Sequence, residues 1–116
     1  MVDDRWAART SLAAILELIG YQVLEAEDGI QAHGILGSMH FDAMVLDIRL
    51  PGMDGATLLA AVPDPPPTVI LSATELGVHA RQRLGAVVVA ELRKPVAPQL
   101  LIDAVAAAVS GGMDAA

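Results

Sequence analysis

Hydrophobic and polar residues alternate along this chain with two periods, one typical of amphipathic helices and one typical of buried strands. The first helix is predicted to end at Gly20, which supplies a helix stop. Its apolar residues recur at helical spacing: Leu12, Ile15, Leu16 and Ile19. The polar residues elsewhere on its helical wheel are Arg5, Arg9 and Glu17. This spacing predicts a helix with one apolar stripe that faces a core.

The rest of the chain predicts strands and helices in alternation. Apolar runs predict strands at residues 21–26, 43–47, 68–73 and 86–92. Helical patterns predict helices at residues 28–40, 56–62, 74–85 and 97–110. The helix at 28–40 is expected to be short, because Gly34 and Gly37 each cost about 1 kcal/mol relative to alanine. Strands that are apolar on both faces and alternate with helices indicate an α/β fold, with a parallel sheet covered by helices on both sides.

Polar residues stand at the carboxyl ends of these strands, which is where ligands bind in open α/β sheets. They are Asp3, Asp4, Asp47, Ser72 and Lys94. Asp47 closes the apolar run "AMVLD", and a carboxylate at the end of a buried strand needs a partner or a chemical role. The carboxyl ends of the strands are therefore the predicted location of the functional site.

Composition limits the classes of protein that remain. A length of 116 residues with 54% hydrophobic content fits one compact domain, predicted at residues 1–110 and followed by a flexible tail at 111–116. The formal net charge of −7 argues against direct contact with nucleic acid, and the lack of cysteine excludes thiolate chemistry. Every apolar run is shorter than the roughly 18 residues of a membrane helix, and nothing resembles a signal peptide. A soluble, cytoplasmic protein without membrane contact is expected.

If the polar side chains at the strand ends converge, together they form the site of a phosphoryl acceptor. Three carboxylates at one sheet edge repel one another unless a cation lies among them, and ligands that are all oxygen favour Mg²⁺. Asp47 would attack phosphorus and become an acyl phosphate. The metal and Lys94 would neutralise charge on the transferred group, and the Ser72 hydroxyl would donate to one of its oxygens.

Four segments, in the right order, resemble the signature segments of the response-regulator receiver domain of two-component signalling, the CheY-like family. They are "VDD" at 2–4, "LDIRLPGMDG" at 46–55, "ILSA" at 70–73 and "RKP" at 93–95. The similarity extends over nearly the whole chain and includes "AEDGIQA" at 26–32. It implies a flavodoxin-like, three-layer fold whose five-stranded parallel sheet has the order 2-1-3-4-5.

The resemblance also implies a metal-binding role for each matching acidic residue. Asp47 would be the phosphoacceptor. Asp4 and Asp47 would bind Mg²⁺ directly, and Asp3 would hold it through water. The backbone carbonyl of Arg49 would complete the protein ligands.

The remaining matching residues would act on the phosphoryl group or shape the loop after Asp47. Lys94 would pair with the phosphoryl group, and Ser72 would follow it on activation. Pro51 fixes one backbone angle of that loop, and Gly55 permits a tight turn before the next helix.

Two features depart from the family pattern. Only Met1 and Val2 precede Asp3, so the first strand is expected to be truncated, and a form extended upstream is expected to unfold at a higher temperature. The residue three positions before Lys94 is Glu91, where the family commonly has an aromatic residue that takes part in signalling. The usual aromatic switch is therefore expected to be missing.

Two hypotheses for function remain open. The first is a receiver that takes a phosphoryl group on Asp47 from a histidine kinase or phosphotransfer protein and relays a conformational signal, without being an enzyme. The alternative is a receiver-like interaction module that acts independently of phosphorylation, through the surface around Glu91 and the last helix. An aspartyl-phosphate hydrolase is disfavoured, because Arg49 stands where such enzymes have a second acid. The apolar surface of residues 97–110 also predicts a homodimer through the last helix region.

Overall fold

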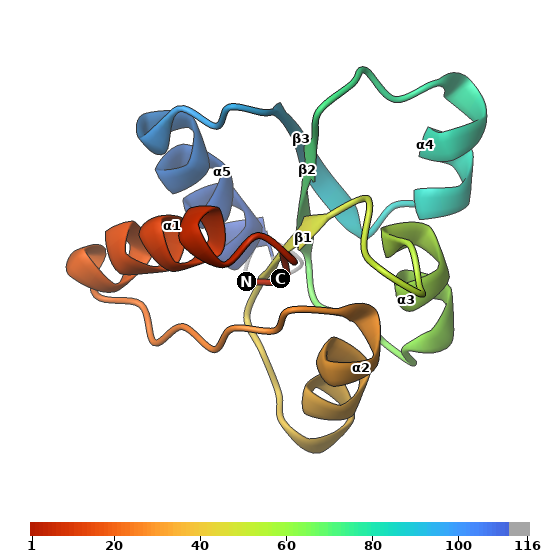
Figure 1. Ribbon diagram of the computed structural model, residues 1–116, viewed down its shortest axis with the longest axis horizontal. Helices are drawn as coiled ribbons and strands as arrows, with labels where there is room; N and C mark the ends of the chain where they lie inside the picture. The colour runs from red at the N-terminus through yellow and green to blue at the C-terminus, as the bar shows by residue number, and fades with distance from the viewer. Residues whose placement is uncertain (112–116) are drawn as a thin grey trace.

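The computed structural model describes residues 1–111, in which helices cover both faces of a parallel sheet (Figure 1). The strands are β1 (Met44–Asp47), β2 (Thr68–Ser72) and β3 (Val88–Arg93), hydrogen-bonded in the order β1-β2-β3. The helices are α1 (Trp6–Ile19), α2 (Gly29–Ser38), α3 (Gly55–Ala61), α4 (Val78–Leu84) and α5 (Pro98–Gly111). All five predicted helices are confirmed, as are the predicted strands at 43–47, 68–73 and 86–92.

The two segments expected to complete a five-stranded sheet are each reduced to a single bridged residue. Val2 forms parallel bridges to Ala26 on one side and to Leu46 of β1 on the other. The Asp47 N–H donates to the Val2 carbonyl (2.9 Å), and the Ala26 N–H donates to the Met1 carbonyl (2.9 Å). The lateral order is therefore 24–26, 1–3, β1, β2, β3, in agreement with the order 2-1-3-4-5.

The predicted regular strand at 21–26 is wrong, because a strand needs a continuous neighbour that pairs with its backbone groups. Residues 1–3 offer partners only to the last part of this segment, where the Asp3 N–H donates to the Ala26 carbonyl (3.1 Å). Residues 21–25 consequently have no regular secondary structure. The sheet has three regular strands within residues 1–111, not five.

Alternate residues of β1 and β2 face opposite helical layers, as expected for strands buried on both faces. Leu46 and Ile70 belong to a core cluster with residues of α2 and α3. Val69 and Leu71 belong to a second cluster with Leu101 and other residues of α5. Figure 1 shows the same division, with α1 and α5 on one side of the sheet and α3 and α4 on the other. This packing fixes the carboxyl ends of the strands at one edge of the molecule.

The buried face of α1 is rotated relative to the prediction. Its buried residues are Arg9, Ala13 and Leu16. Ile19, predicted in the core, is 49% exposed. Arg9, predicted outside the apolar stripe, is buried because its guanidinium has partners: Nη1 donates to the Asp3 carbonyl (2.9 Å), and Nε pairs with Glu25 (2.9 Å).

Helix α5 buries part of the apolar surface that suggested a partner-binding face. Its buried residues include Leu101, Ala104, Val105 and Ala108. Leu100 is its large apolar residue with high exposure, at 57%. The helix continues through Gly111, and the rest of the predicted tail, 112–116, lies outside the described residues. Within 1–111, no helix has the length and apolar character needed to cross a membrane.

Asp54 caps α3, and removing this cap is expected to destabilise the domain. Its Oδ1 accepts a hydrogen bond from the Thr57 N–H (2.8 Å), and this bond lowers the pKa of Asp54. Asp54→Ala is expected to reduce the free energy of unfolding by about 1 kcal/mol at pH 7, measured by urea denaturation. Because the folded-state pKa is depressed, this contribution is present above the ordinary carboxyl pKa and is lost as pH falls through the folded value. The difference from wild type should therefore shrink in acid.

The matched control for this cap is Asp54→Asn, which keeps the accepting side-chain oxygen and removes the charge. We expect Asp54→Asn to lose clearly less stability than Asp54→Ala and to lose the pH dependence. Equal losses in the two variants would show that the hydrogen bond to Thr57 does not stabilise α3.

Candidate functional site

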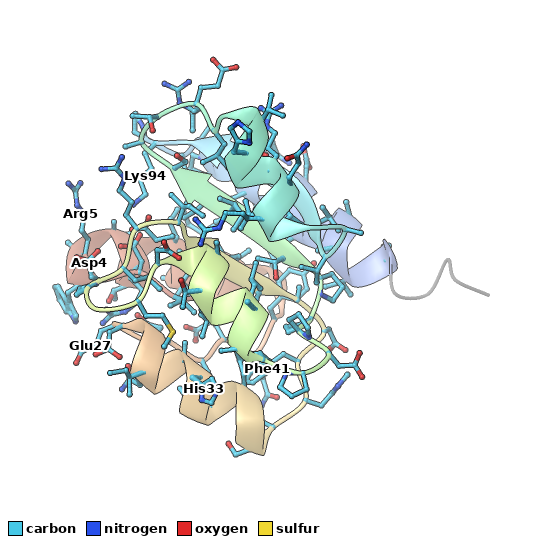
Figure 2. All side chains as sticks on the ribbon, turned by 90° about the vertical axis from the view of Figure 1, so that its right-hand side faces the viewer. Asp4, Arg5, Glu27, His33, Phe41 and Lys94 are labelled. Atoms are coloured by element: carbon cyan, nitrogen blue, oxygen red, sulfur yellow. The ribbon has the colours of Figure 1, made fainter. Side chains whose placement is uncertain are left out.

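Three carboxylates from two segments converge at the carboxyl end of the sheet. Asp3 and Asp4 follow the bridged residue Val2, and Asp47 is the last residue of β1. One carboxylate oxygen from each of the three lies within 4.8 Å of the others. Asp3 and Asp47 are buried, whereas Asp4 is exposed, and Figure 2 shows Asp4 at the surface of the molecule. The cluster is thus set into the sheet and reaches solvent through Asp4.

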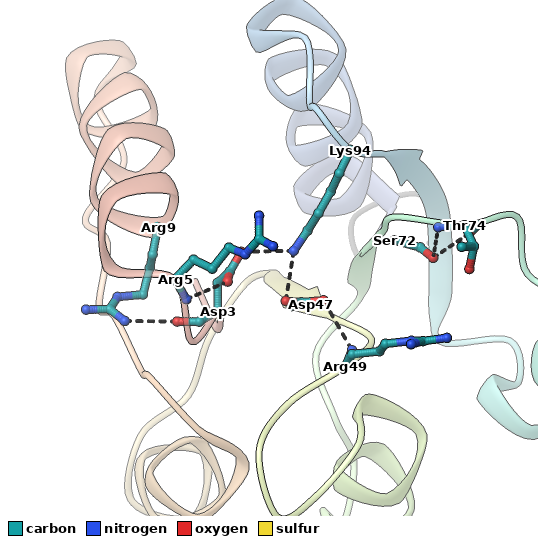
Figure 3. Close-up of polar contacts among 8 residues, drawn as sticks. All are labelled: Asp3, Arg5, Arg9, Asp47, Arg49, Ser72, Thr74 and Lys94. Atoms are coloured by element: carbon teal, nitrogen blue, oxygen red, sulfur yellow. Dashed lines mark hydrogen bonds and ion pairs between the residues drawn. The ribbon is translucent and has the colours of Figure 1, made fainter.

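Lys94 supplies the positive charge that faces this cluster (Figure 3). Its Nζ lies 2.8 Å from Oδ2 of Asp47 and 3.5 Å from Oδ2 of Asp3. Lys94 directly follows β3, and its backbone N–H donates to the Ser72 carbonyl at the end of β2 (2.9 Å). The parallel register of the sheet therefore brings a lysine far along the chain onto two aspartates.

The two carboxylate oxygens of Asp3 have different surroundings. Oδ1 accepts a hydrogen bond from the Arg5 N–H (2.9 Å). Oδ2 is fully buried and has no hydrogen-bond partner within residues 1–111, although Lys94 lies 3.5 Å away. A buried carboxylate oxygen without a hydrogen bond costs free energy, and a hard cation among the three carboxylates would satisfy it. The residues therefore fit a divalent cation such as Mg²⁺.

The loop after β1 holds the Asp47 side chain and passes close to the strand. Oδ1 of Asp47 accepts a hydrogen bond from the Arg49 N–H (3.1 Å). A Cβ at Gly55 would lie 3.2 Å from Cα of Ile48 and 3.3 Å from the Asp47 carbonyl oxygen, so this position requires glycine for close approach. The positive φ of this loop, +73°, occurs instead at Gly52, a requirement that the sequence interpretation missed.

Ser72 lies at the end of β2, next to the cluster in the sheet, but its hydroxyl points elsewhere. It donates to the Thr74 carbonyl and accepts a hydrogen bond from the Thr74 N–H (3.3 Å). The six predicted site residues thus fall into two groups. Asp3, Asp4, Asp47 and Lys94 lie together, and Arg49 contacts Asp47 through its N–H, whereas Ser72 is engaged in its own turn.

Glu91 stands at the position where the family commonly has an aromatic residue. In this chain its side chain forms an ion pair. Its carboxylate lies 3.2 Å from the Arg81 guanidinium on α4. Both side chains are partly solvent-exposed, so the pair contributes little to stability. It nevertheless connects α4 to β3 on the surface of the domain.

Arg9 supports the site from α1 and was not predicted to do so. It holds the Asp3 carbonyl and Glu25 together, and therefore fixes the backbone that presents Asp3. A sequence signal existed: Arg9 precedes Ala13 by four positions and Leu16 by seven, which places all three on one helical face.

Replacing Arg9 with methionine is expected to lower the free energy of unfolding by about 2 kcal/mol, measured by chemical denaturation. Methionine keeps an apolar stem but leaves the buried Asp3 carbonyl without its side-chain donor. Arg5→Met is the matched control, because the exposed Arg5 side chain makes no hydrogen bond within residues 1–111 and should change stability by no more than about 0.5 kcal/mol. Similar losses in both variants would contradict a supporting role for Arg9.

Comparison with known proteins agrees with this arrangement. The family model described as "Response regulator receiver domain" matches residues 1–106. The aerobic respiration control protein ArcA of Escherichia coli K12 is 40% identical over 58 residues, which cover 50% of this chain and 24% of ArcA. Sporulation initiation phosphotransferase F of Bacillus subtilis is 37% identical over 59 residues, covering 51% of this chain and 48% of that protein.

A solved structure shows the same fold. The CheY-like response regulator receiver domain protein from Methanospirillum hungatei JF-1 superposes with a TM-score of 0.86 at 24% identity, covering 99% of this chain and 94% of that one. The aligned regions take in less than half the length of the two curated relatives named above. The activities of those whole proteins are therefore not assigned to this chain.

Proposed function

The chain belongs to the response regulator receiver domain family, and on this basis we propose that it accepts a phosphoryl group on Asp47 and relays a signal by conformational change. The observation that carries the proposal is the convergence of three carboxylates with Lys94 at the carboxyl end of the sheet. As a receiver, the domain is a signalling component and not an enzyme that turns over a separate substrate.

The proposed reaction uses the Asp47 carboxylate as the nucleophile. Its oxygen forms a bond to phosphorus while the bond between phosphorus and the donor's histidine nitrogen breaks, and that electron pair leaves with the imidazole. Lys94 already contacts Oδ2 of Asp47 and is placed to pair with the phosphoryl oxygens as negative charge arrives. The Ser72 hydroxyl would have to leave the Thr74 carbonyl before it could donate to the phosphoryl group.

The acidic cluster is also proposed to hold Mg²⁺. Asp4 and Asp47 would bind the ion directly, Asp3 through water, and Arg49 through its backbone carbonyl. The fully buried Oδ2 of Asp3, which lacks a hydrogen bond, supports this assignment. When bound, Mg²⁺ would neutralise charge on the transferred group, which is the main requirement of phosphoryl transfer.

A receiver implies a histidine kinase as its partner, and we propose that a histidine kinase or a phosphotransfer protein supplies the phosphoryl group.

A second candidate function is a receiver-like interaction module that acts independently of phosphorylation. The ion pair between Glu91 and Arg81 supports this second candidate, because Glu91 stands where the family commonly has an aromatic residue that takes part in signalling. Dimerisation through the α5 region, where Leu100 is exposed, stays a prediction that light scattering with and without an acyl-phosphate analogue would test.

The proposed function is tested by intact-protein mass spectrometry after incubation with MgCl₂ and a small acyl-phosphate donor. We expect the mass of one added phosphoryl group, no addition when EDTA removes the metal, and loss of the group after hydroxylamine treatment, which cleaves acyl phosphates. No adduct in a chain shown to be folded would contradict phosphoryl acceptance and favour the interaction module.

A further inference from the structure

The backbone of Asp3 is held on both sides by groups outside the carboxylate cluster. Its N–H donates to the Ala26 carbonyl (3.1 Å), and its carbonyl accepts a hydrogen bond from Nη1 of Arg9 (2.9 Å). The side chain is fixed as well, because Oδ1 accepts from the Arg5 N–H (2.9 Å). These contacts leave Oδ2, which has no hydrogen-bond partner within residues 1–111, at 3.5 Å from Nζ of Lys94. Asp3 is therefore presented to the cluster in one orientation.

Arg9 makes its contact with Asp3 from a buried position on α1. The residue is 8% exposed, and its Nε lies 2.9 Å from Oε1 of Glu25. Thr10 donates from Oγ1 to the same glutamate oxygen (3.3 Å). Figure 3 shows Arg9 on one side of Asp3 and Lys94 on the other. Because the planar guanidinium joins the Asp3 carbonyl to Glu25 through two of its N–H groups, the two contacts fix each other's positions.

The positive charge of Arg9 opposes any benefit that its position gives to a bound cation. A guanidinium next to Asp3 repels a divalent cation in the cluster, so charge alone predicts that removing Arg9 would strengthen Mg²⁺ binding. Groups outside the ligand sphere that orient the ligands commonly change metal affinity by about 10–100-fold. If Arg9 orients Asp3, removing it would therefore weaken Mg²⁺ binding. The two effects of Arg9 predict changes of opposite sign.

We propose that Arg9 is a positioning residue for the metal site, which raises the affinity of the acidic cluster for Mg²⁺ by holding the backbone of Asp3 and Asp4. Its action is indirect, because it contacts the Asp3 carbonyl and not the carboxylate oxygens that converge with Asp47. The fork that joins the Asp3 carbonyl to Glu25 is the feature that performs this role. The inference rests on the proposed function, since it requires a cation among the three carboxylates.

The test measures the binding of Mn²⁺, which prefers the same oxygen ligands as Mg²⁺ and whose free ion is detected by electron paramagnetic resonance. We expect the wild-type chain to bind Mn²⁺ that Mg²⁺ displaces, and Arg9→Met to bind it about tenfold more weakly. Circular dichroism of the same samples gives the folded fraction, for which the affinity is corrected. Equal or tighter binding by folded Arg9→Met would overturn this inference alone. No Mn²⁺ binding by the wild type would overturn the proposed metal site as well.

Two further variants separate geometry from charge. Arg5→Met removes the same charge from an exposed side chain that makes no hydrogen bond within residues 1–111, and its Mn²⁺ affinity should be unchanged or higher. Arg9→Lys keeps the charge but lacks the fork that joins the Asp3 carbonyl to Glu25, and we expect about threefold weaker binding. Wild-type affinity in Arg9→Lys, or an equal loss in Arg5→Met, would overturn the proposal.

A destabilised variant with all charges intact distinguishes metal affinity from stability. Leu84 is buried at the last position of α4, which leads to the start of β3 at the end of the sheet opposite the cluster. Leu84→Ala is expected to lower the temperature of unfolding and to keep wild-type Mn²⁺ affinity in the folded protein. If its affinity fell as far as that of Arg9→Met, the weaker binding would follow from lost stability, and the positioning role of Arg9 would be overturned.

Discussion

Replacing Asp47 with asparagine is expected to abolish phosphoryl acceptance while leaving the domain folded and, without divalent cations, at least as stable as wild type. An amide lacks the nucleophilic carboxylate oxygen that forms the acyl phosphate. The fold should tolerate the change, because three clustered carboxylates face one lysine in the wild type and repel one another. Removing one negative charge relieves this repulsion. A loss of phosphoryl acceptance in this variant can therefore be distinguished from a loss of folded structure.

The measurements for Asp47→Asn are intact mass after acyl-phosphate treatment, and urea denaturation with and without MgCl₂. We expect no adduct, and a smaller Mg²⁺-dependent increase in the free energy of unfolding than in wild type, since a ligand stabilises the state that binds it. Asp64→Asn is the matched control, because Asp64 has a positive φ (52°) that asparagine tolerates and lies outside the cluster. An adduct on Asp47→Asn would place the phosphoacceptor elsewhere.

The parts of the fold that local patterns determine could be predicted from the sequence. β1 and β2 are apolar on both faces, so their identity as buried strands follows from their residues alone. Asp47 and Lys94 stand directly at strand ends, and parallel strands bring such ends to one edge. The convergence of the carboxylates therefore followed from position in sequence once the sheet was assumed to be parallel.

The features that were missed depend on partners far away in sequence. Residues 21–25 alternate like a strand but form no regular ladder, because pairing depends on the segment beside them. Arg9 is buried only because the Asp3 carbonyl and Glu25 accept its guanidinium. The direction of the Ser72 hydroxyl depends on the turn at Thr74. Local periodicity carries no information about such contacts.

Replacing Lys94 with methionine is expected to lower the free energy of unfolding by about 3 kcal/mol at pH 7 in the absence of Mg²⁺. The change leaves Asp3 and Asp47 buried and without the cation that faces both of them. Removing one partner of a buried ion pair typically costs about 3–5 kcal/mol, and the partial exposure of Lys94, 20% for its side chain, places the expected value near the lower limit. Added Mg²⁺ should restore part of the stability, because the ion can occupy the same carboxylates.

The same variant is expected to accept the phosphoryl group about 100-fold more slowly, since the loss of one preorganised charge at the reacting group commonly has an effect of this size. Lys94→Arg is the matched control, because it keeps the charge and should retain most of the stability, although a planar guanidinium cannot reproduce the contacts of a compact ammonium. Urea denaturation and time-resolved intact mass measure the two effects. Wild-type stability in Lys94→Met would contradict the electrostatic role assigned to Lys94.

A double variant that combines Lys94→Met with Asp47→Asn distinguishes a charge effect from a loss of packing. If Lys94 stabilises the fold by compensating the carboxylates, removing the Asp47 charge should reduce the cost of losing Lys94 by at least about 1 kcal/mol, because Nζ and Oδ2 of Asp47 are in direct contact at 2.8 Å. If Lys94 acted mainly through its aliphatic stem, the two changes would be additive. Non-additive stability combined with complete loss of phosphoryl acceptance would identify the Asp47–Lys94 pair as one electrostatic unit, in which the lysine offsets part of the repulsion among the three carboxylates.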